Sequence, residues 1–308
     1  MVTRIGIHTS IEALFPPAVL RDRLDDLDPE AVVVDTDELD GVDGLVTFAY
    51  DDAFLDAGLD WIHSVQSGVD RFPFDALEAA GTSLTNSTGV HGDSVGETVA
   101  GYMLSFARRL HEFRSKQERE QWAWADWDAP FTLADSAVCV VGLGTLGRGI
   151  AARADALGMD VTGVKRTPTP VDHVDTVHPS SELRTAIDGP KFVALAVPLT
   201  EETEGLIGAD ELAAMRDDAV LVNVARGAVV EQSALIDALR ADELAGAALD
   251  VFETEPLPEG SPLWGMDDVI VTPHSAAAHR EYPDRMAALI RENVRRIDRG
   301  ERLANQVV

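Results

Sequence analysis

Short apolar runs alternate along the chain with polar segments whose apolar residues recur at helical spacing. In the first part of the chain the runs predict strands over 5–7, 32–34, 45–48, 62–65 and 83–85, and the spacing predicts helices over 17–27 and 52–57. Further runs predict strands over 137–141, 160–164, 192–197, 219–224, 247–251 and 269–272, with helices over 209–215 and 231–241. Because strands and helices alternate, we expect an α/β fold built on parallel sheets.

A long helix is predicted to begin after Gly92, because apolar positions keep helical spacing from there to Phe113. Three tryptophans follow in a polar loop, at positions Trp122, Trp124 and Trp127. Tryptophans clustered on a loop are more typical of packing or of a subunit contact than of a ligand site. We therefore interpret this loop as the dimerisation arm of a homodimer.

The last part of the chain predicts an amphipathic helix over 283–299, which ends at Gly300 and leads into an apolar tail over 303–308. We expect this tail to return to the first domain. The chain would then form two Rossmann-like domains: a doubly wound parallel sheet over 99–278 for a dinucleotide, and a smaller, flavodoxin-like and discontinuous substrate domain over 1–98 and 279–308. The active site is expected in the cleft between them.

The acidic balance of the chain disfavours several classes of partner. The sequence has 54 Asp and Glu against 25 Lys and Arg, a formal net charge of −29, and the acids are scattered along it. Such a surface disfavours nucleic acids and anionic membranes, and it resembles the lysine-poor surfaces of proteins from halophiles that accumulate salt. No apolar stretch is long enough to span a membrane and no signal peptide is apparent. The single cysteine, Cys139, fits a reducing cytoplasm, and we expect no metal site.

A glycine motif follows the predicted strand over 137–141 and opens a run with helical spacing. It reads Gly142-Leu-Gly144-Thr145-Leu146-Gly147, and a second strand follows over 160–164. In such a βαβ unit the first glycine makes a tight turn, the second lets the backbone approach a pyrophosphate, and the third lets the helix pack close to the strand. The alternative is a glycine-rich turn of another α/β protein, but the flanking strands and helix favour dinucleotide binding.

The end of the second strand indicates which dinucleotide is bound. An NAD site usually has an acid about 20 residues past the glycines, whereas this chain has Lys165, Arg166 and Thr167 there and no acid until Asp172. An arginine pairs bidentately with a 2′-phosphate and a lysine adds a point charge. The alternative is two solvated bases on a loop. Because the chain has only three lysines, we expect NADP(H) to be preferred over NAD(H).

Three polar residues follow predicted strands at the edge where doubly wound sheets bind ligands: Arg226, Glu255 and His274. Reduction of a 2-keto acid by hydride requires such a set. Arg226 would hold the substrate carboxylate and polarise the ketone, His274 would donate a proton to its oxygen, and Glu255 would stabilise the imidazolium. Taken singly, the three residues also fit a helix-start turn, a surface loop and a satisfied strand-end histidine.

One further turn has the character of an anion site. The segment 66–70 directly follows a predicted strand and presents the consecutive amides of Ser67, Gly68 and Val69, which could hold a carboxylate.

These motifs together resemble the D-2-hydroxyacid dehydrogenase family. The similarity extends from about residue 43 to 299 and rests on six blocks in family order: VQSGVD at 65–70, VVGLGTLG at 140–147, AVPLT at 196–200, VNVARG at 222–227, LDVFETEP at 249–256 and TPH at 272–274. The resemblance implies a catalytic role for Arg226, Glu255 and His274. It also implies that the amides of 67–69, with Arg226, bind substrate. Tyr50 stands where relatives often contact substrate, although a packed surface tyrosine is an alternative.

The resemblance further implies a set of residues that contact the cofactor. Asp250 would lie at its nicotinamide end. The other expected contacts are Gly142, Gly144, Thr145, Leu146, Gly147, Lys165, Arg166, Thr167, Val197, Pro198, Thr203, Val224, Ala225 and His274.

The activity implied by the resemblance is NADPH-dependent reduction of 2-keto acids to D-2-hydroxy acids. The D-hand is favoured because the nucleotide-binding fold lies in the middle of the chain. Ser275-Ala-Ala-Ala278 after the histidine, in place of a Gly-Gly pair, and the end of the chain one helix later argue against a phosphoglycerate dehydrogenase. Two alternatives stay open: a glyoxylate/hydroxypyruvate reductase, and a non-enzymatic nucleotide sensor like the family's transcriptional corepressors.

Overall fold

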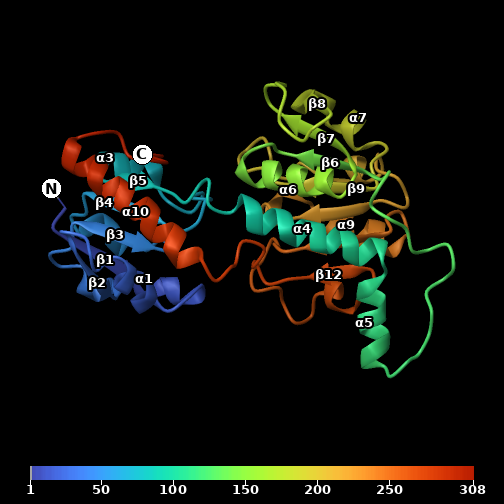
Figure 1. The fold of residues 1–308 in the computed structure, drawn as a ribbon, viewed down its shortest axis with the longest axis horizontal. Helices are drawn as coiled ribbons and strands as arrows, with labels where there is room; N and C mark the ends of the chain where they lie inside the picture. Colours follow the sequence, from blue (N-terminus) through green and yellow to red (C-terminus); the bar gives the residue numbers. More distant parts are fainter. Residues whose placement is uncertain (1) are drawn as a thin grey trace. The chain divides into compact units, whose positions relative to one another are not determined.

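The computed structural model describes residues 2–308 and divides them into two compact units (Figure 1). One contains the residues up to His91 together with Ala278–Val308, and the other is Gly92–Ala277. The sequence predicted divisions at 98/99 and 278/279, whereas the two units divide at 91/92 and 277/278. The first division lies seven residues earlier than expected because the whole of helix α4 (Gly92–Ala107) packs within the second unit.

Glycines explain why α4 belongs to the second unit. It crosses helix α6 (Thr145–Ala156) so closely that a Cβ atom on Gly149 would lie 1.9 Å from the carbonyl oxygen of Gly92. A Cβ atom on Gly96 would lie 2.4 Å from the carbonyl oxygen of Gly149. The two backbones are therefore in direct contact, and no larger residue fits at the crossing.

The first unit is built on a parallel sheet of five strands. They are β1 (Arg4–His8), β2 (Glu30–Val34), β3 (Gly44–Thr47), β4 (Trp61–Ser64) and β5 (Ser83–Thr85), arranged in the order β2-β1-β3-β4-β5. This is the flavodoxin-like order, as predicted. Neighbouring residues in the strands face opposite layers: Leu45 and Ile62 pack on one side of the sheet, and Val46 and Trp61 on the other.

Two pairs of helices cover the sheet of the first unit. Helices α1 (Pro17–Arg23) and α10 (Tyr282–Arg299) pack against the face that carries Val46, whereas α2 (Ala53–Asp56) and α3 (Phe74–Ala80) lie with the residues of the other face. The tail after α10 runs antiparallel along the free edge of β5, where Gln306 pairs with Thr85. The predicted return of the tail to the first part of the chain is therefore correct.

The second unit has a parallel sheet of seven strands. They are β6 (Ala137–Val141), β7 (Asp160–Lys165), β8 (Thr176–Pro179), β9 (Phe192–Leu195), β10 (Val220–Asn223), β11 (Gly246–Leu249) and β12 (Val269–Val271). Their order, β12-β11-β10-β9-β6-β7-β8, is the doubly wound order extended by one strand. Helices α4 and α6 cover one face, and α7 (Leu183–Ile187), α8 (Ala209–Leu212) and α9 (Gln232–Arg240) cover the other.

Shorter elements complete the description. Five 3₁₀ turns connect strands and helices: η1 (Thr9–Ala13), η2 (Thr36–Glu38), η3 (Ser180–Glu182), η4 (Gly227–Val229) and η5 (Pro262–Gly265). Within residues 2–308, no helix combines the length and the apolar character needed to cross a membrane.

The expected long helix after Gly92 is interrupted. Arg109 adopts a left-handed backbone conformation (φ +55°), so α4 ends at Ala107 and a separate helix, α5 (Leu110–Glu118), continues from it. Helix α5 and the loop that carries the tryptophans extend away from the body of the second unit (Figure 1). The side chains of Trp122, Trp124 and Trp127 are 88–100% exposed in the chain by itself.

Candidate active site

Three polar residues lie just past the carboxyl ends of three adjacent strands of the second unit. Arg226 follows β10, Glu255 follows β11 and His274 follows β12, and these strands are neighbours in the sheet. This edge is where doubly wound sheets bind ligands. The topology thus brings residues that are far apart in sequence to one edge.

His274 and Glu255 form a hydrogen-bonded pair, with 2.8 Å between Nδ1 and Oε2. The other carboxylate oxygen of Glu255 accepts from the amide of Phe252 at 3.1 Å. Burial by itself raises the pKa of Glu255, but the hydrogen bond and charge of His274, the Phe252 amide and the charge of Arg226 together bring that pKa below its ordinary value. Since the carboxylate accepts from Nδ1–H, Nε2 is the ring nitrogen left for a substrate.

The backbone that carries His274 is held by Asp250, the residue that follows β11. The amide of His274, which has a left-handed conformation (φ +51°), donates to the Asp250 carbonyl at 2.8 Å. The Asp250 carboxylate accepts from the amides of Ser275 and Ala276, each at 2.9 Å, and from the Thr272 hydroxyl at 2.6 Å. Asp250 is 2% exposed, so this carboxylate fixes the histidine loop from within the protein.

A tyrosine on α4 extends this network. The Tyr102 hydroxyl lies 2.5 Å from the Thr272 hydroxyl oxygen. Because the single proton of Thr272 is donated to Asp250, Tyr102 must be the donor in its own contact. Burial raises the pKa of Tyr102 to about 12, which keeps that proton in place.

Arg226 is positioned by a buried asparagine at the end of β10. Asn223 donates to the Arg226 carbonyl and accepts from the amide of Ala225, both at 3.0 Å, and it is 1% exposed. The next residue, Gly227, lies directly on the segment that leads to Glu255. A Cβ atom there would lie 1.8 Å from the carbonyl carbon of Phe252.

The glycine motif has the geometry that phosphate binding requires. Gly142 has φ +97°, and a Cβ atom on Gly147 would lie 1.8 Å from the Gly142 carbonyl oxygen. Apart from Gly144 and its two neighbours in the chain, no atom of residues 2–308 lies within 4 Å of a Cβ atom placed on Gly144, so the backbone there is open to a ligand. Thr145 and Leu146 begin α6, where amides have no intrahelical acceptor. A side chain at Gly144 would occupy the space in front of these amides, and this open space fits a dinucleotide phosphate.

The basic residues lie at the end of β7, next to the glycine motif in the sheet order. Lys165 closes the strand and donates to a threonine hydroxyl of the same loop at 3.0 Å, while Arg166 and Thr167 are exposed. Glu202 faces Arg166 from the loop after β9. A neighbouring threonine hydroxyl and the charge of Arg166 lower the pKa of Glu202.

The remaining expected cofactor contacts follow β9 and β10. Val197 and Pro198 lie two and three residues past the end of β9, and Thr203 donates to the Pro198 carbonyl at 2.6 Å, which closes the loop into a turn. Val224 and Ala225 are buried after β10. These residues share the sheet edge of the catalytic candidates.

In the first unit, the turn after β4 presents three amides. The N–H groups of Ser67, Gly68 and Val69 have no acceptor within residues 2–308. The turn is held from behind, because Asn86 donates to the Ser67 carbonyl at 2.7 Å and the Ser67 hydroxyl donates to the Ser87 carbonyl at 3.2 Å. Successive amides without acceptors are the feature by which turns of this kind can bind an anion.

Tyr50 follows β3 and packs its ring against Phe54 and Phe72. Burial and the carboxylate of Asp52 raise the pKa of Tyr50. The side chain is half-buried, which agrees with the alternative of a packed tyrosine and keeps substrate contact as a prediction.

The second unit thus gathers the candidate catalytic and cofactor residues at one sheet edge, and the first unit holds the Ser67–Val69 turn and Tyr50. Sequence reasoning missed Asn86, Tyr102, Asn223 and Thr272. For Asn223 a signal was available, because an asparagine inside an otherwise apolar strand must find partners when buried.

Comparison with known proteins identifies the family. Residues 100–276 match the model for "D-isomer specific 2-hydroxyacid dehydrogenase, NAD binding domain". The chain belongs to this family. Its members are NAD(P)-dependent oxidoreductases that act on CH–OH groups.

Several members of the D-2-hydroxyacid dehydrogenase family are similar over most of the chain. A glyoxylate/hydroxypyruvate reductase B of Escherichia fergusonii is 32% identical over 90% of this chain and 91% of its own length. A glyoxylate reductase of Korarchaeum cryptofilum is 34% identical over 78% of this chain and 74% of its own length. A D-3-phosphoglycerate dehydrogenase of Methanocaldococcus jannaschii is 34% identical, but the match spans 46% of its length.

A solved family structure is similar throughout. The D-isomer-specific 2-hydroxyacid dehydrogenase of Xanthobacter autotrophicus Py2, in complex with NADPH and MES, is 33% identical, with a TM-score of 0.81 over 100% of this chain and 98% of its own. The predicted fold, family and class of enzyme are therefore correct.

Proposed function

We propose that the protein is an NADPH-dependent D-2-hydroxyacid dehydrogenase that works mainly as a 2-keto acid reductase. The observation that carries this proposal is the His274–Glu255 pair, 2.8 Å apart, which shares a sheet edge with Arg226 and with the glycine motif. The edge combines a proton donor, its counter-ion, a fixed positive charge and a phosphate cradle.

Each residue has a defined task in the proposed reaction. Arg226 holds the substrate carboxylate and polarises the ketone. His274, protonated and hydrogen-bonded to Glu255 through Nδ1, donates the Nε2 proton to the ketone oxygen, and Glu255 stabilises the imidazolium. The bound cofactor supplies the hydride that reduces C2. In the opposite direction neutral His274 takes the hydroxyl proton.

We assign the second unit to the dinucleotide and the first to the substrate. The open amides of Ser67, Gly68 and Val69 fit a carboxylate, and Tyr50 is proposed to contact the rest of the acid. The names of the relatives support glyoxylate and hydroxypyruvate as the first acids to test.

The preference for NADPH rests on Lys165 and Arg166. They lie at the end of β7, where an NAD site usually has an acid, and the family member of Xanthobacter autotrophicus contains NADPH. Lys165 and Arg166 would each make a charge-assisted contact to the 2′-phosphate, and solvent weakens the contact of the exposed Arg166. We therefore expect kcat/KM to be about 10- to 100-fold higher for NADPH than for NADH.

Steady-state reduction of a keto acid series tests the activity. Glyoxylate, hydroxypyruvate, pyruvate and branched-chain acids are each followed at 340 nm with NADPH in molar KCl. His274→Asn should abolish turnover. His173→Asn is the matched control, since His173 pairs with Asp155 at 2.6 Å near the last turn of α6, away from the glycine motif at the start of that helix. Nucleotide binding without turnover of any acid would refute the enzyme and favour a nucleotide sensor.

The cofactor preference has its own test. The double variant Lys165→Ala/Arg166→Ala should lose most of the preference for NADPH while its kcat with NADH stays within about threefold of wild type. The matched control, Lys191→Ala/Arg216→Ala, removes the same charges beside Asp218 in the same unit and should keep the preference. Equal use of both cofactors by the wild type would refute the assignment.

We also propose a homodimer in which a second copy covers the tryptophan loop. Trp122, Trp124 and Trp127 are almost fully exposed in the single chain, and aromatic residues of this size are characteristic of buried interfaces. Light scattering should give the mass of a dimer. Replacing the three tryptophans with serine should give a monomer, whereas a monomeric wild type would refute the proposal.

The proposed compartment is the reducing cytoplasm. Cys139 is buried in β6, and burial raises the pKa of its thiol to about 12, so it stays an unreactive thiol.

A further inference from the structure

We propose that the C-terminal tail, residues 301–308, positions the substrate-binding turn. Asn305 and Asn86 act as positioning residues for the amides of Ser67–Val69. This inference rests on the proposed function, in which those amides bind the substrate carboxylate. It concerns contacts within the first unit only.

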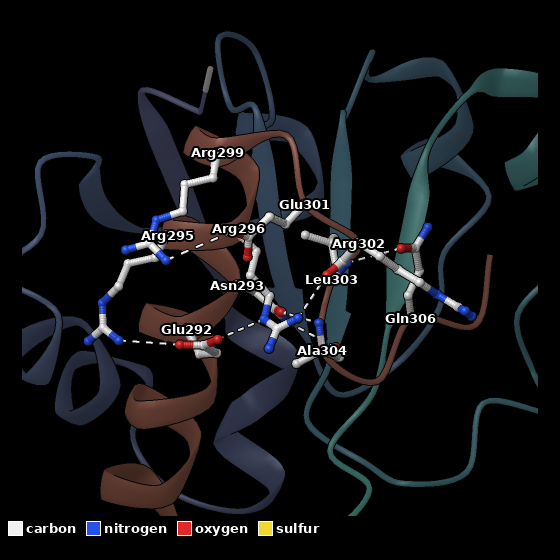
Figure 2. A network of polar contacts seen from close by, with 10 residues as sticks. All are labelled: Glu292, Asn293, Arg295, Arg296, Arg299, Glu301, Arg302, Leu303, Ala304 and Gln306. Carbon is white, nitrogen blue, oxygen red and sulfur yellow. Dashed lines mark hydrogen bonds and ion pairs between the residues drawn. The ribbon is translucent and has the colours of Figure 1, made fainter.

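The tail is first fixed to α10 (Figure 2). Asn293, which is fully buried on that helix, accepts from the amide of Ala304 at 2.7 Å and donates to its carbonyl at 3.3 Å. Arg296, held by Glu292 at 2.7 Å, donates to the Arg302 carbonyl at 3.0 Å. Two side chains of the helix therefore take backbone groups of the tail as partners and set its path.

The tail then pairs with β5 and the residue that follows it. The amide of Val307 donates to the Leu84 carbonyl at 2.8 Å, and the amide of Asn86 donates to the Asn305 carbonyl at 3.2 Å. Asn305 has φ +55°, a left-handed conformation that asparagine tolerates better than most residues. Asn305 is the first tail residue whose backbone pairs with the β5 region, and the chain turns into that pairing through this left-handed conformation.

The Asn305 side chain bridges the loop that follows β5. Its Nδ2 donates to the Thr88 carbonyl at 2.7 Å and to the Asn86 carbonyl at 3.1 Å. A single amide group thus ties together both ends of the segment 86–88. Without it, these two carbonyls would have to find water or other donors.

The segment 86–88 holds the substrate-binding turn from behind. Asn86 accepts from the Thr88 amide at 3.1 Å, which fixes the orientation of its own amide, and Nδ2 donates to the Ser67 carbonyl at 2.7 Å. The Ser87 amide donates to the Gln66 carbonyl at 3.1 Å, and the Ser67 hydroxyl donates to the Ser87 carbonyl. The carbonyl groups of Gln66 and Ser67 and the Ser67 hydroxyl are therefore all hydrogen-bonded to the segment 86–88. The amides of the turn stay open, and these are the groups that would bind the substrate carboxylate.

Three variants test the inference. Asn305→Gly removes the bridging amide but keeps the left-handed backbone, since glycine adopts it without strain. Asn86→Ala removes the donor to Ser67 itself. The matched control is Gln306→Ala, which also removes two hydrogen bonds, but both of them lie within the tail.

The readout separates positioning from general damage. Kinetics are measured for the 2-keto acid that the wild type reduces best and for the neutral amide of the same acid, and NADPH affinity is measured by fluorescence. Asn305→Gly should raise KM for the acid about tenfold, a difference of about 1.4 kcal/mol, with kcat and NADPH affinity within about twofold of wild type. Turnover of the neutral amide should change much less, because its uncharged carbonyl oxygen is a weaker acceptor for these amides than a carboxylate. Asn86→Ala should have a larger effect, and Gln306→Ala none.

Three results would overturn the inference. One is a wild-type KM for the acid in both asparagine variants when both are folded. Another is an equal fall in kcat/KM for the acid and for its neutral amide, because this would indicate that the variants disturb the structure as a whole. If the wild type itself reduces no 2-keto acid, or does not favour the acid over its amide, the proposed function fails at its substrate-binding step and the positioning role fails with it. The wild-type measurement thus separates the two failures.

Discussion

Replacing Asp250 with asparagine changes one buried acceptor into a donor and leaves the size of the side chain unchanged. One carboxylate oxygen accepts from Thr272 and Ser275, and the other accepts from the Ala276 amide at 2.9 Å. In the variant, the amide oxygen can still accept from Thr272 and Ser275, but the NH₂ group then points at the Ala276 N–H and cannot accept from it. The alternative orientation sets the same conflict against Ser275.

The cost follows from these contacts. A hydrogen bond to a charged group contributes about 1.5–3 kcal/mol, and a buried N–H left without an acceptor costs about 1–3 kcal/mol. Because relief of the buried charge offsets part of this sum, we expect a net loss of about 3 kcal/mol in the free energy of unfolding. For a unit of this size the loss lowers Tm by about 6–12 °C. His274 is carried by the same loop, and a displacement of about 1 Å can reduce kcat about 100-fold.

Thermal denaturation and steady-state kinetics measure the two effects together. Asp237→Asn, at an exposed position on α9, is the matched control and should leave both Tm and kcat unchanged. Tyr102→Phe should produce a smaller change in the same direction, because it removes one hydrogen bond at the outer end of the network. If Asp250→Asn keeps Tm within about 2 °C and kcat within about threefold, the carboxylate does not hold the histidine loop and the reasoning is refuted.

Three other predictions follow from packing and charge. Gly227→Ala places a Cβ atom 1.8 Å from the Phe252 carbonyl carbon, so kcat/KM should fall at least about tenfold and Tm should be lower. Gly189→Ala is the control, because the space around that position is open and both values should stay unchanged. Wild-type kinetics in Gly227→Ala would contradict the geometry. Burial lowers the pKa of His63 to about 3 and that of His91 to about 4. Between about pH 4 and 6.5 the unfolded chain, with histidine pKa near 6.5, then binds more protons than the folded protein, so the protein loses stability as the pH is lowered through that window. His63 alone should account for about 2 kcal/mol of this loss between pH 7 and 5, and a constant urea midpoint there would disprove it. With a net charge of −29, Tm should rise with KCl and level off above about 1 M, where the Debye length is about 3 Å; a Tm that is independent of salt would exclude self-repulsion as a determinant of stability.

Most of the sheet structure could be predicted from the sequence, because buried parallel strands appear as short apolar runs. The strands 83–85 and 137–141 coincide with β5 and β6. Strand β8 was missed since it lies at the sheet edge, is partly exposed throughout and ends at a proline. The break at Arg109 was missed as well, because nothing in the side chain of an arginine indicates a left-handed backbone.

The candidate site could be predicted as far as strand ends define it. Arg226, Glu255 and His274 follow apolar runs, and parallel strands bring their carboxyl ends to one edge. The residues that hold them could not be found this way. Tyr102 lies in an apolar helix and Thr272 follows a strand, and only tertiary packing reveals that their hydroxyl groups meet. The same holds for Asn86 and Asn305, which are brought together by the return of the tail.

The discontinuity of the first unit has a consequence for synthesis of the protein. Helix α10 and the tail cover one face of its sheet and the free edge of β5, yet they follow the complete second unit in the chain. Ribosomes add about 5–20 residues per second, so the intervening stretch of about 190 residues takes roughly 10–40 s. During this interval the nascent first unit exposes an apolar face and an unpaired strand edge, the two features that make an incomplete domain prone to aggregation. The second unit is continuous in sequence and can fold before the first unit is completed.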